Sequence, residues 1–345
     1  MDQQSGVPYG SPASPLFSVQ ETASSGRGVF ATETIPKGTA LWSTGGPDAD
    51  VVLREYRREL CAYCFKYDRG REWKLRNSAA GFAYCSEACR EKWAETLEED
   101  GVEAWMQVEK LNKGSSREIE MVNAVNPIPT EGDVGEAWEE ADIKARLIRL
   151  ARSGSTTKTH RKALASALAA PPCPDILAFL LSGILMRARK SDEWQRTLAL
   201  WPNTTPYKSH ADLEEHTRSF LHLVSVLPPT LLEHATRETC FLLSTRDSHN
   251  SFGIRSLDDD GAEFFGYGIW ASASYFNHSC SPNVRKKRVG RQWYFRASRD
   301  IGLGEELCIT YLSGEERALP TKERREMLKN AWGFRCGCAK CRAGA

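Results

Sequence analysis

Seven of the 11 cysteines lie in two short blocks whose spacing is typical of metal ligands. The second block, CGCAKC, holds Cys336, Cys338 and Cys341. A tetrahedral zinc site takes four ligands, so this block needs one more from elsewhere in the chain. The odd number of cysteines and the lack of a secretory pattern at the N-terminus favour thiolate chemistry over a disulfide framework.

Four cysteines outside the two blocks are candidates for the missing ligand. Cys173 lies in a proline-rich break, Cys240 in a helical apolar run and Cys308 within a strand, where a small buried hydrophobe is the ordinary explanation. Cys280 lies in NHSCSP, a turn-rich loop with many polar groups. We therefore expect Cys280 to complete the site.

The first block predicts a second metal site. Its cysteines follow a C-x2-C, x20, C-x3-C pattern: Cys61, Cys64, Cys85 and Cys89. Ser86 is an expected N-cap for the helix formers that follow, so the second pair lies at a helix start. The alternative is four buried thiols without a metal.

The elements around these blocks alternate between β-rich and helical. Residues 26–42 predict a β-meander with a turn at PKG, and residues 103–243 have helical periodicity. Within that helical region, KTHRKA (158–163) is interpreted as a solvated linker, and residues 228–245 as one helix. Residues after 258 are β-rich, with a hairpin at VGR followed by the strand RQWYFRA and a final helix at 322–332.

Composition excludes some partners. The 46 basic and 45 acidic side chains nearly cancel, so no strong attraction to nucleic acid or to an anionic membrane is expected. The longest apolar run, Ile176 to Met186, is too short to span a bilayer. We expect a soluble monomer of the nucleus or the cytoplasm.

Several motifs together resemble the SET domain of protein lysine methyltransferases. They are FNHSCSPN (276–283), GEELCITYL (304–312), the C-x-C-x2-C tail and the opening RGVFATETIPKG (27–38). With the cysteine block inserted after the first strands, the chain resembles the SET and MYND domain family, in a compact form like the fungal members. The resemblance spans roughly Phe17 to Cys341.

The resemblance implies an α+β fold: a mainly β SET core of small twisted sheets with a pseudo-knotted C-terminal part. Residues 1–15 are rich in Pro, Gly and Ser and are expected to form a disordered leader. The segments that follow are an N-terminal SET segment (16–56), a truncated MYND-like zinc finger (57–97), a helical insertion (98–243), a core SET segment (244–315) and a post-SET helix with a zinc-bound tail (316–345).

The resemblance also implies a set of ligands. In the family the cysteine of NHSC and the three tail cysteines bind one zinc, which here means Cys280, Cys336, Cys338 and Cys341. With the first block, two zinc ions are expected. A full MYND finger binds two zincs through eight ligands, but here only Cys61, Cys64, Cys85 and Cys89 are present. The finger is therefore truncated, and its usual contacts with peptides or DNA are in doubt.

The family binds S-adenosylmethionine, and five residues match its contacts. Arg27 and Gly28 belong to the GRG loop, which uses mainly backbone groups, and a glycine lets those groups approach closely. Asn277 matches the contact to the methionyl end. His278 matches a residue whose backbone meets the adenine, so no role is expected for its imidazole. Phe334 matches the aromatic that stacks on the adenine.

Tyr311 matches the catalytic tyrosine of the family. Methyl transfer to lysine is an in-line displacement that needs alignment, exclusion of water and a neutral amine, whose unperturbed pKa is about 10.4. A buried hydroxyl can orient this amine and shape the field at the methyl group. Read alone, Tyr311 would be an ordinary strand aromatic.

The expected function is an S-adenosylmethionine-dependent protein-lysine N-methyltransferase acting on an accessible lysine of a protein, histones included. The alternative is a catalytically silent SET scaffold that works as an interaction module. Asn277, Tyr311 and Phe334 favour the enzyme, because a scaffold needs zinc but no tyrosine hydroxyl. The larger animal members continue into a helical C-terminal domain, whereas this sequence ends at Ala345, so a more open substrate groove is expected.

Overall fold

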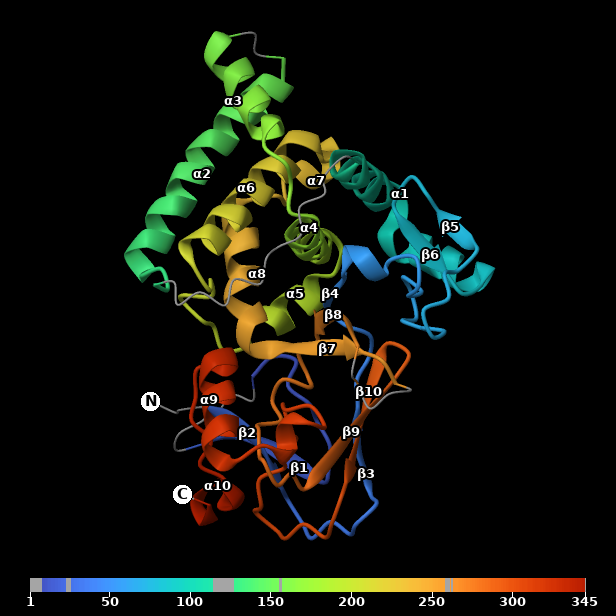
Figure 1. Ribbon diagram of the computed structural model, residues 1–345, viewed down its shortest axis with the longest axis vertical. Coiled ribbons are helices and arrows are strands. Elements are labelled where there is room, and N and C mark those ends of the chain that lie inside the picture. The colour runs from blue at the N-terminus through green and yellow to red at the C-terminus, as the bar shows by residue number, and fades with distance from the viewer. Residues whose placement is uncertain are drawn as a thin grey trace. The chain divides into compact units, whose positions relative to one another are not determined.

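The computed structural model describes residues 8–22, 26–113, 127–154, 157–257, 261 and 263–344. The chain divides into two compact units (Figure 1). Unit 1 comprises Met1–Asp48, Asp192–Trp201 and Ser248–Ala345, and unit 2 comprises Ala49–Ser191 and Pro202–Asp247. Each unit is therefore built from segments that are distant in sequence.

Unit 1 contains small antiparallel sheets. β1 pairs with β2, β10 pairs with both β3 and β9, and β7 pairs with β8. The strand bounds are β1 (Phe17–Glu21), β2 (Arg27–Ala31), β3 (Ala40–Ser43), β7 (Ser251–Arg255), β8 (Phe264–Ile269), β9 (Val284–Val289) and β10 (Gln292–Ala297).

The predicted hairpin is present as β9 and β10, which are joined by a turn at Gly290 and Arg291, with Gly290 at a φ of 57°. Trp293, Phe295 and Ala297 alternate inward along β10, as a half-buried strand requires. The meander predicted at 26–42 is wrong, because its two strands do not pair with each other. β2 and β3 both form, but they lie in different sheets, because β3 finds its partner in β10.

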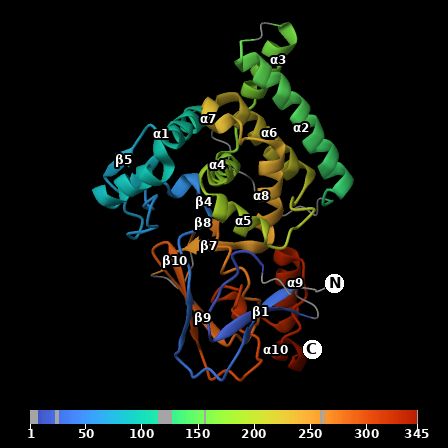
Figure 2. The ribbon, with the colours of Figure 1, turned by 180° about the vertical axis from the view of Figure 1, so that it is seen from behind.

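The helices of unit 1 are short. They are α5 (Ser191–Leu198), the 3-10 helix η2 (Glu316–Ala318), α9 (Thr321–Trp332) and α10 (Ala339–Ala343). The predicted final helix is α9, which ends at Gly333 in the left-handed conformation at a φ of 73°. Within this unit, α9 and α10 lie on the side away from β3 and β10 in both views (Figures 1 and 2).

Unit 2 is mainly helical. Its elements are β4 (Ala49–Val52), the 3-10 helix η1 (Arg54–Tyr56), β5 (Leu75–Asn77), β6 (Phe82–Tyr84), α1 (Glu87–Asn112), α2 (Glu131–Arg152), α3 (Lys158–Ala169), α4 (Pro174–Arg189), α6 (His210–Val226), α7 (Pro229–Leu232) and α8 (Arg237–Asn250). The apolar run predicted from sequence forms the middle of α4, which is buried and packs against α1, α6 and α7 (Figure 1).

Two predictions in the helical region are wrong. KTHRKA belongs to α3, because Thr157 caps a new helix there by accepting from the backbone N–H of His160, at 3.3 Å. That helix has no buried residue, so its exposure is as expected. The single helix expected at 228–245 is instead α7 and α8, separated by a turn in which the backbone N–H of Ala235 donates to Leu231 O.

The predicted α+β class is confirmed, with small antiparallel sheets and several helices. Of the expected leader, residues 1–7 lie outside the described residues, whereas Ser14 bridges to Phe17 and Pro15 accepts from the hydroxyl of Thr32. The other segment boundaries stay predictions.

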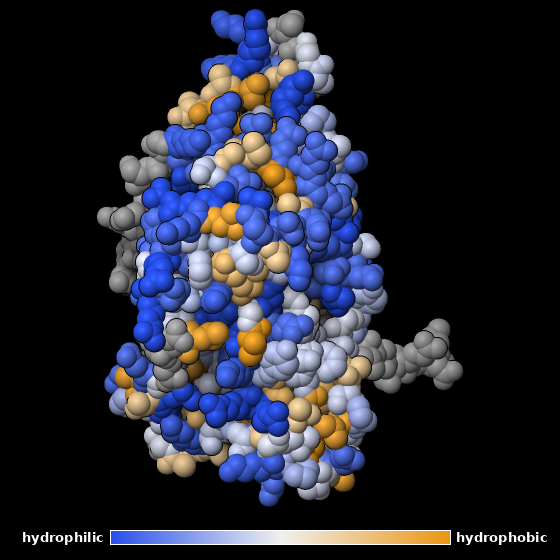
Figure 3. All heavy atoms as spheres, turned by 90° about the vertical axis from the view of Figure 1, so that its right-hand side faces the viewer, coloured by the Kyte–Doolittle hydropathy of each residue, from blue (hydrophilic) through white to orange (hydrophobic). Residues whose placement is uncertain are grey.

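The face drawn in Figure 3 is mostly hydrophilic, with apolar residues in separate patches. Within the described part of the chain, every helix is too short or too polar to cross a membrane.

Candidate active site and metal centres

The NHSC loop lies against the chain segment that carries GEEL. The backbone N–H of Ile309 donates to Asn277 O at 2.9 Å, and that of Ser279 donates to Ile309 O at 2.8 Å. On its other edge the same segment meets β2, since Leu307 N–H donates to Val29 O at 2.7 Å. Three motifs that are far apart in sequence are therefore hydrogen-bonded side by side within unit 1.

Asn277 is held by this arrangement beside the GRG loop. Its side-chain Nδ2 donates to Arg27 O at 3.0 Å and to Glu306 Oε1 at 2.7 Å. The Arg27 guanidinium points elsewhere, since it donates to Ala199 O and lies over the ring of Tyr275. Only the backbone of Arg27 thus joins the group formed by Asn277 and Gly28.

Gly28 lets two polar side chains approach its backbone closely. A Cβ at this position would lie 2.5 Å from Glu306 Oε1 and 2.9 Å from Asn277 Nδ2, closer than real Cβ contacts. A side chain here would push Asn277 and Glu306 apart.

We therefore expect Gly28→Ala to lower the free energy of unfolding by about 1–3 kcal/mol through overpacking. Gly45→Ala is the matched control, because nothing lies within 4 Å of its added Cβ. Chemical denaturation of both variants measures the difference. Equal stability of the two variants would contradict the close approach at Gly28.

Two residues of this site were missed by sequence reasoning. Glu306 anchors Asn277, and the buried Asn283 donates to Glu306 O at 2.8 Å while its Oδ1 accepts from Cys308 N–H, also at 2.8 Å. Both lie inside the quoted motifs, NHSCSPN and GEEL. Both residues could therefore have been noted from the motifs, but only the fold shows that their side chains form hydrogen bonds between the two motifs.

Tyr311 lies at the end of the GEEL segment, where the NHSC loop and the tail meet. Its hydroxyl donates to Phe276 O at 3.2 Å. Its ring packs at centroid distances of 5.4 Å from Trp332 and 6.3 Å from Phe334, the latter edge-on. Burial raises the pKa of Tyr311, with smaller contributions from Cys308 and Glu306, so the phenol is protonated at neutral pH.

His278 stands between Tyr311 and the tail cysteines. Its Nδ1 accepts from the backbone N–H of Tyr311 at 3.0 Å, and its Nε2 lies 3.3 Å from the sulfur of Cys280. Burial, with the positive charges of Lys286 and Arg324, lowers the pKa of His278 to about 4. The imidazole, for which no role was expected, thus makes two polar contacts.

The tail cysteines and Cys280 form one cluster. The sulfurs of Cys280, Cys336, Cys338 and Cys341 all lie within 4.8 Å of one another. Cys280 Sγ is 3.5 Å from that of Cys341 and 3.9 Å from that of Cys336. Four sulfurs placed tetrahedrally about 2.3 Å from a zinc ion would lie about 3.8 Å apart, so this donor set fits zinc.

A cation lies beside this cluster. The buried Arg324 of α9 places Nη2 3.9 Å from Cys341 Sγ and 3.1 Å from the hydroxyl oxygen of Thr321. Four thiolates around Zn²⁺ carry a net charge of −2, and a buried guanidinium offsets part of it. The helical pattern of the sequence did not predict that Arg324 would lie beside the cysteine cluster.

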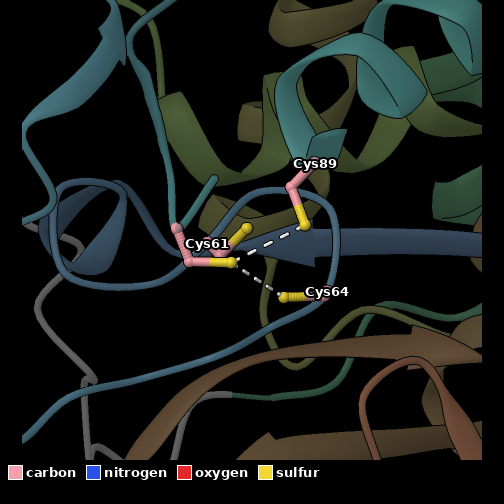
Figure 4. Close-up of side chains that lie close together, drawn as sticks. Cys61, Cys64 and Cys89 are labelled. Atoms are coloured by element: carbon pink, nitrogen blue, oxygen red, sulfur yellow. Dashed lines mark hydrogen bonds between the residues drawn. The ribbon is translucent and has the colours of Figure 1, made fainter. Parts of the chain in front are cut away.

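The first block forms a second cluster, in unit 2. The sulfurs of Cys61, Cys64, Cys85 and Cys89 also lie within 4.8 Å of one another. Figure 4 shows the sulfurs of Cys61, Cys64 and Cys89 turned toward a common centre, and Cys89 comes from the first turn of α1. Sulfur-to-sulfur distances of 3.5 and 3.6 Å join Cys85 to Cys64 and Cys89, again as zinc requires.

Local structure explains why this cluster forms. Ser86 is the N-cap predicted from sequence, and its hydroxyl accepts from Cys89 N–H at 3.3 Å. On β6, Phe82 packs against Trp93 and Trp105 of α1, at centroid distances of 5.4 and 4.9 Å. This aromatic packing holds α1, which carries Cys89, against β6, the strand that directly precedes Cys85.

The remaining cysteines lie outside both clusters of the described chain. Cys173 and Cys240 are buried, and burial raises the pKa of each thiol. Cys308 is half-buried within the GEEL segment, and burial raises its pKa to about 12. The expectation that it lies within a strand is wrong, because this segment makes only isolated bridges, at Glu306 and Ile309. All three match the expectation of small buried side chains better than that of ligands.

Comparison with known proteins identifies the family. The SET domain model matches residues 26–312. The chain belongs to the SET domain family. The match runs from the GRG loop to the end of GEELCITYL, which is most of the range that the resemblance of the motifs spanned.

Relatives of this SET domain chain carry methyltransferase names. The potential protein lysine methyltransferase SET6 of Saccharomyces cerevisiae is 25% identical over 96% of this chain and 96% of its own length. Human SMYD3, a histone-lysine N-methyltransferase, is 40% identical over 27% of this chain and 20% of its own. A SET and MYND domain-containing protein of Dictyostelium discoideum is 37% identical over 27% of this chain. The resemblance to SET and MYND domain proteins is thus confirmed.

Proposed function

We propose that this protein is a protein-lysine N-methyltransferase that uses S-adenosylmethionine. The observation that carries the proposal is the arrangement around Tyr311: the NHSC loop and the tail bring the carbonyl of Phe276 and the rings of His278 and Phe334 around one protonated phenol at the end of the GEEL segment. Family membership and the names of the relatives support the reaction class.

The residues present fit the cofactor. S-adenosylmethionine, when bound, would supply a sulfonium methyl group to a lysine amine. The close approach at Gly28 places Asn277 and the Glu306 carboxylate side by side, polar groups that suit the charged methionyl end, and Phe334 offers a ring face for a flat base. The phenol of Tyr311 and the carbonyl of Phe276 place a hydrogen-bond donor and an acceptor side by side, able to orient an incoming amine.

The cysteine clusters support two structural zinc ions. The tail site would fasten Phe334 and the last residues to the NHSC loop, because Cys280 belongs to that loop. The proposed substrate is a protein with an accessible lysine, histones included, and the proposed place of action is the nucleus or the cytoplasm.

Calorimetry with the zinc-loaded chain and S-adenosylmethionine tests the proposal. We expect one binding site per chain. Labelled cofactor and a whole-cell lysate should then yield labelled proteins, and mapping of the modified peptides should place the label on lysine. Absence of detectable binding would favour the alternative function, a catalytically silent scaffold.

A further inference from the structure

The imidazole of His278 makes contacts that point to a role beyond the proposed cofactor site. Its ring lies between the backbone of Tyr311 and the sulfur of Cys280, at 3.0 and 3.3 Å. It also contacts Phe334 at a centroid distance of 6.0 Å. One half-buried side chain therefore touches the candidate catalytic tyrosine, the candidate zinc site and the tail.

The two hydrogen bonds determine which nitrogen carries the proton. A backbone N–H can only donate, so Nδ1, which receives it from Tyr311, is unprotonated. In the neutral ring the proton then resides on Nε2, which donates to Cys280 Sγ. A thiolate bound to zinc is a good acceptor for such a bond, and donors of this kind orient metal ligands and stabilise their charge.

We propose that the His278 imidazole is a positioning residue that couples the four-cysteine tail site to the backbone of Tyr311. The ring is rigid, so a sulfur held by zinc fixes the ring, and the ring fixes the Tyr311 main chain. The Tyr311 hydroxyl is held in turn by Phe276 O at 3.2 Å. This inference rests on the proposed function, and it gives the zinc site a direct effect on the position of the phenol.

Two substitutions separate the two hydrogen bonds. The amide oxygen of Asn is attached to Cγ, as Nδ1 is, so His278→Asn can still accept from Tyr311 but is too short to reach Cys280. The amide nitrogen of Gln lies one bond further out, as Nε2 does, so His278→Gln can still donate to Cys280 but offers no atom at the Nδ1 position.

The experiment measures zinc release and methyl transfer on the same full-length, zinc-loaded proteins. A chromogenic chelator reports the release rate of the tail ion, identified as the phase that persists in Cys64→Ser. We expect His278→Asn to speed this release about tenfold or more and to lower kcat about tenfold even while zinc is saturating, because the link from Cys280 to Tyr311 is then broken. His278→Gln should release zinc at the parental rate but lower kcat about tenfold, with KM for S-adenosylmethionine little changed.

The difference in zinc release between His278→Asn and His278→Gln tests the coupling. A merely structural histidine would make both variants lose zinc and activity together, and that pattern, or parental behaviour of both variants, overturns the coupling. The zinc ion of the first cluster, which is held in unit 2, should be released at the parental rate in both His278 variants and so reports intact folding of the rest of the chain. If the parent transfers no methyl group, the proposed function fails. The coupling is then decided by zinc alone, with equal release from the Asn and Gln variants overturning it.

Discussion

Cys336→Ser is expected to leave one zinc ion per chain instead of two and to abolish detectable binding of S-adenosylmethionine. The serine removes one of four ligands from the cluster that joins the NHSC loop to the tail. Structural zinc contributes about 10–16 kcal/mol of apparent binding free energy in small modules, comparable with the stability of a whole domain. The tail buries little else, so losing the ion should release Phe334 from beside Tyr311 and His278.

Cys64→Ser is the matched control for this prediction. It also removes one sulfur from a four-cysteine cluster, but in unit 2, so it should lose one zinc and keep cofactor binding. Metal analysis of the purified proteins and calorimetry measure both quantities. Two zinc ions in the Cys336→Ser protein, or equal loss of cofactor affinity in both variants, would show that the tail cluster has been assigned the wrong role.

Tyr311→Phe is expected to slow methyl transfer by about two to three decades while cofactor affinity changes little. The substitution deletes one hydroxyl and little volume, so the packing of the ring against Trp332 and Phe334 should survive. Loss of one preorganised donor costs about 3–4 kcal/mol in the transition state. Loss of the bond to Phe276 O should cost only about 1 kcal/mol of stability.

Two further variants serve as comparisons for Tyr311→Phe. Tyr294→Phe removes an exposed hydroxyl from β10, whose partner is the side chain of Gln292, and should keep the parental rate. Asn277→Ala should instead weaken cofactor binding, because it removes the side chain held between Arg27 O and Glu306. Single-turnover kinetics with a verified substrate separates chemistry from binding. A Tyr311→Phe protein working at the parental rate would place the catalytic hydroxyl elsewhere.

The sequence determined the features whose causes are local. The spacing within each cysteine block predicted two groups of thiols, and the Ser86 cap, the β9–β10 hairpin and the helix α9 all formed as expected. Caps, turns and alternating burial depend on residues a few positions apart, so their free energies can be read from a short window.

The errors arose where a nearby residue or a distant partner decided the outcome. Thr157 began a helix in the stretch interpreted as a linker, and residues 228–245 divided into α7 and the first part of α8. β2 and β3 were predicted as strands, but their partners were not, because a strand edge pairs with whatever the fold brings beside it.

The candidate site shows most clearly which features follow from local sequence and which depend on the tertiary structure. Cys280 could be selected from four lone cysteines by the polarity of its loop and by family resemblance, but the fold alone brings it to within 3.5 Å of Cys341. The polar contacts of Glu306, Arg324 and the His278 imidazole were not predictable from spacing. The contacts of Glu306 and Arg324 join groups many residues apart, and that of His278 depends on the direction in which its ring points. Burial and packing of the whole unit, rather than local propensity, determine such placements.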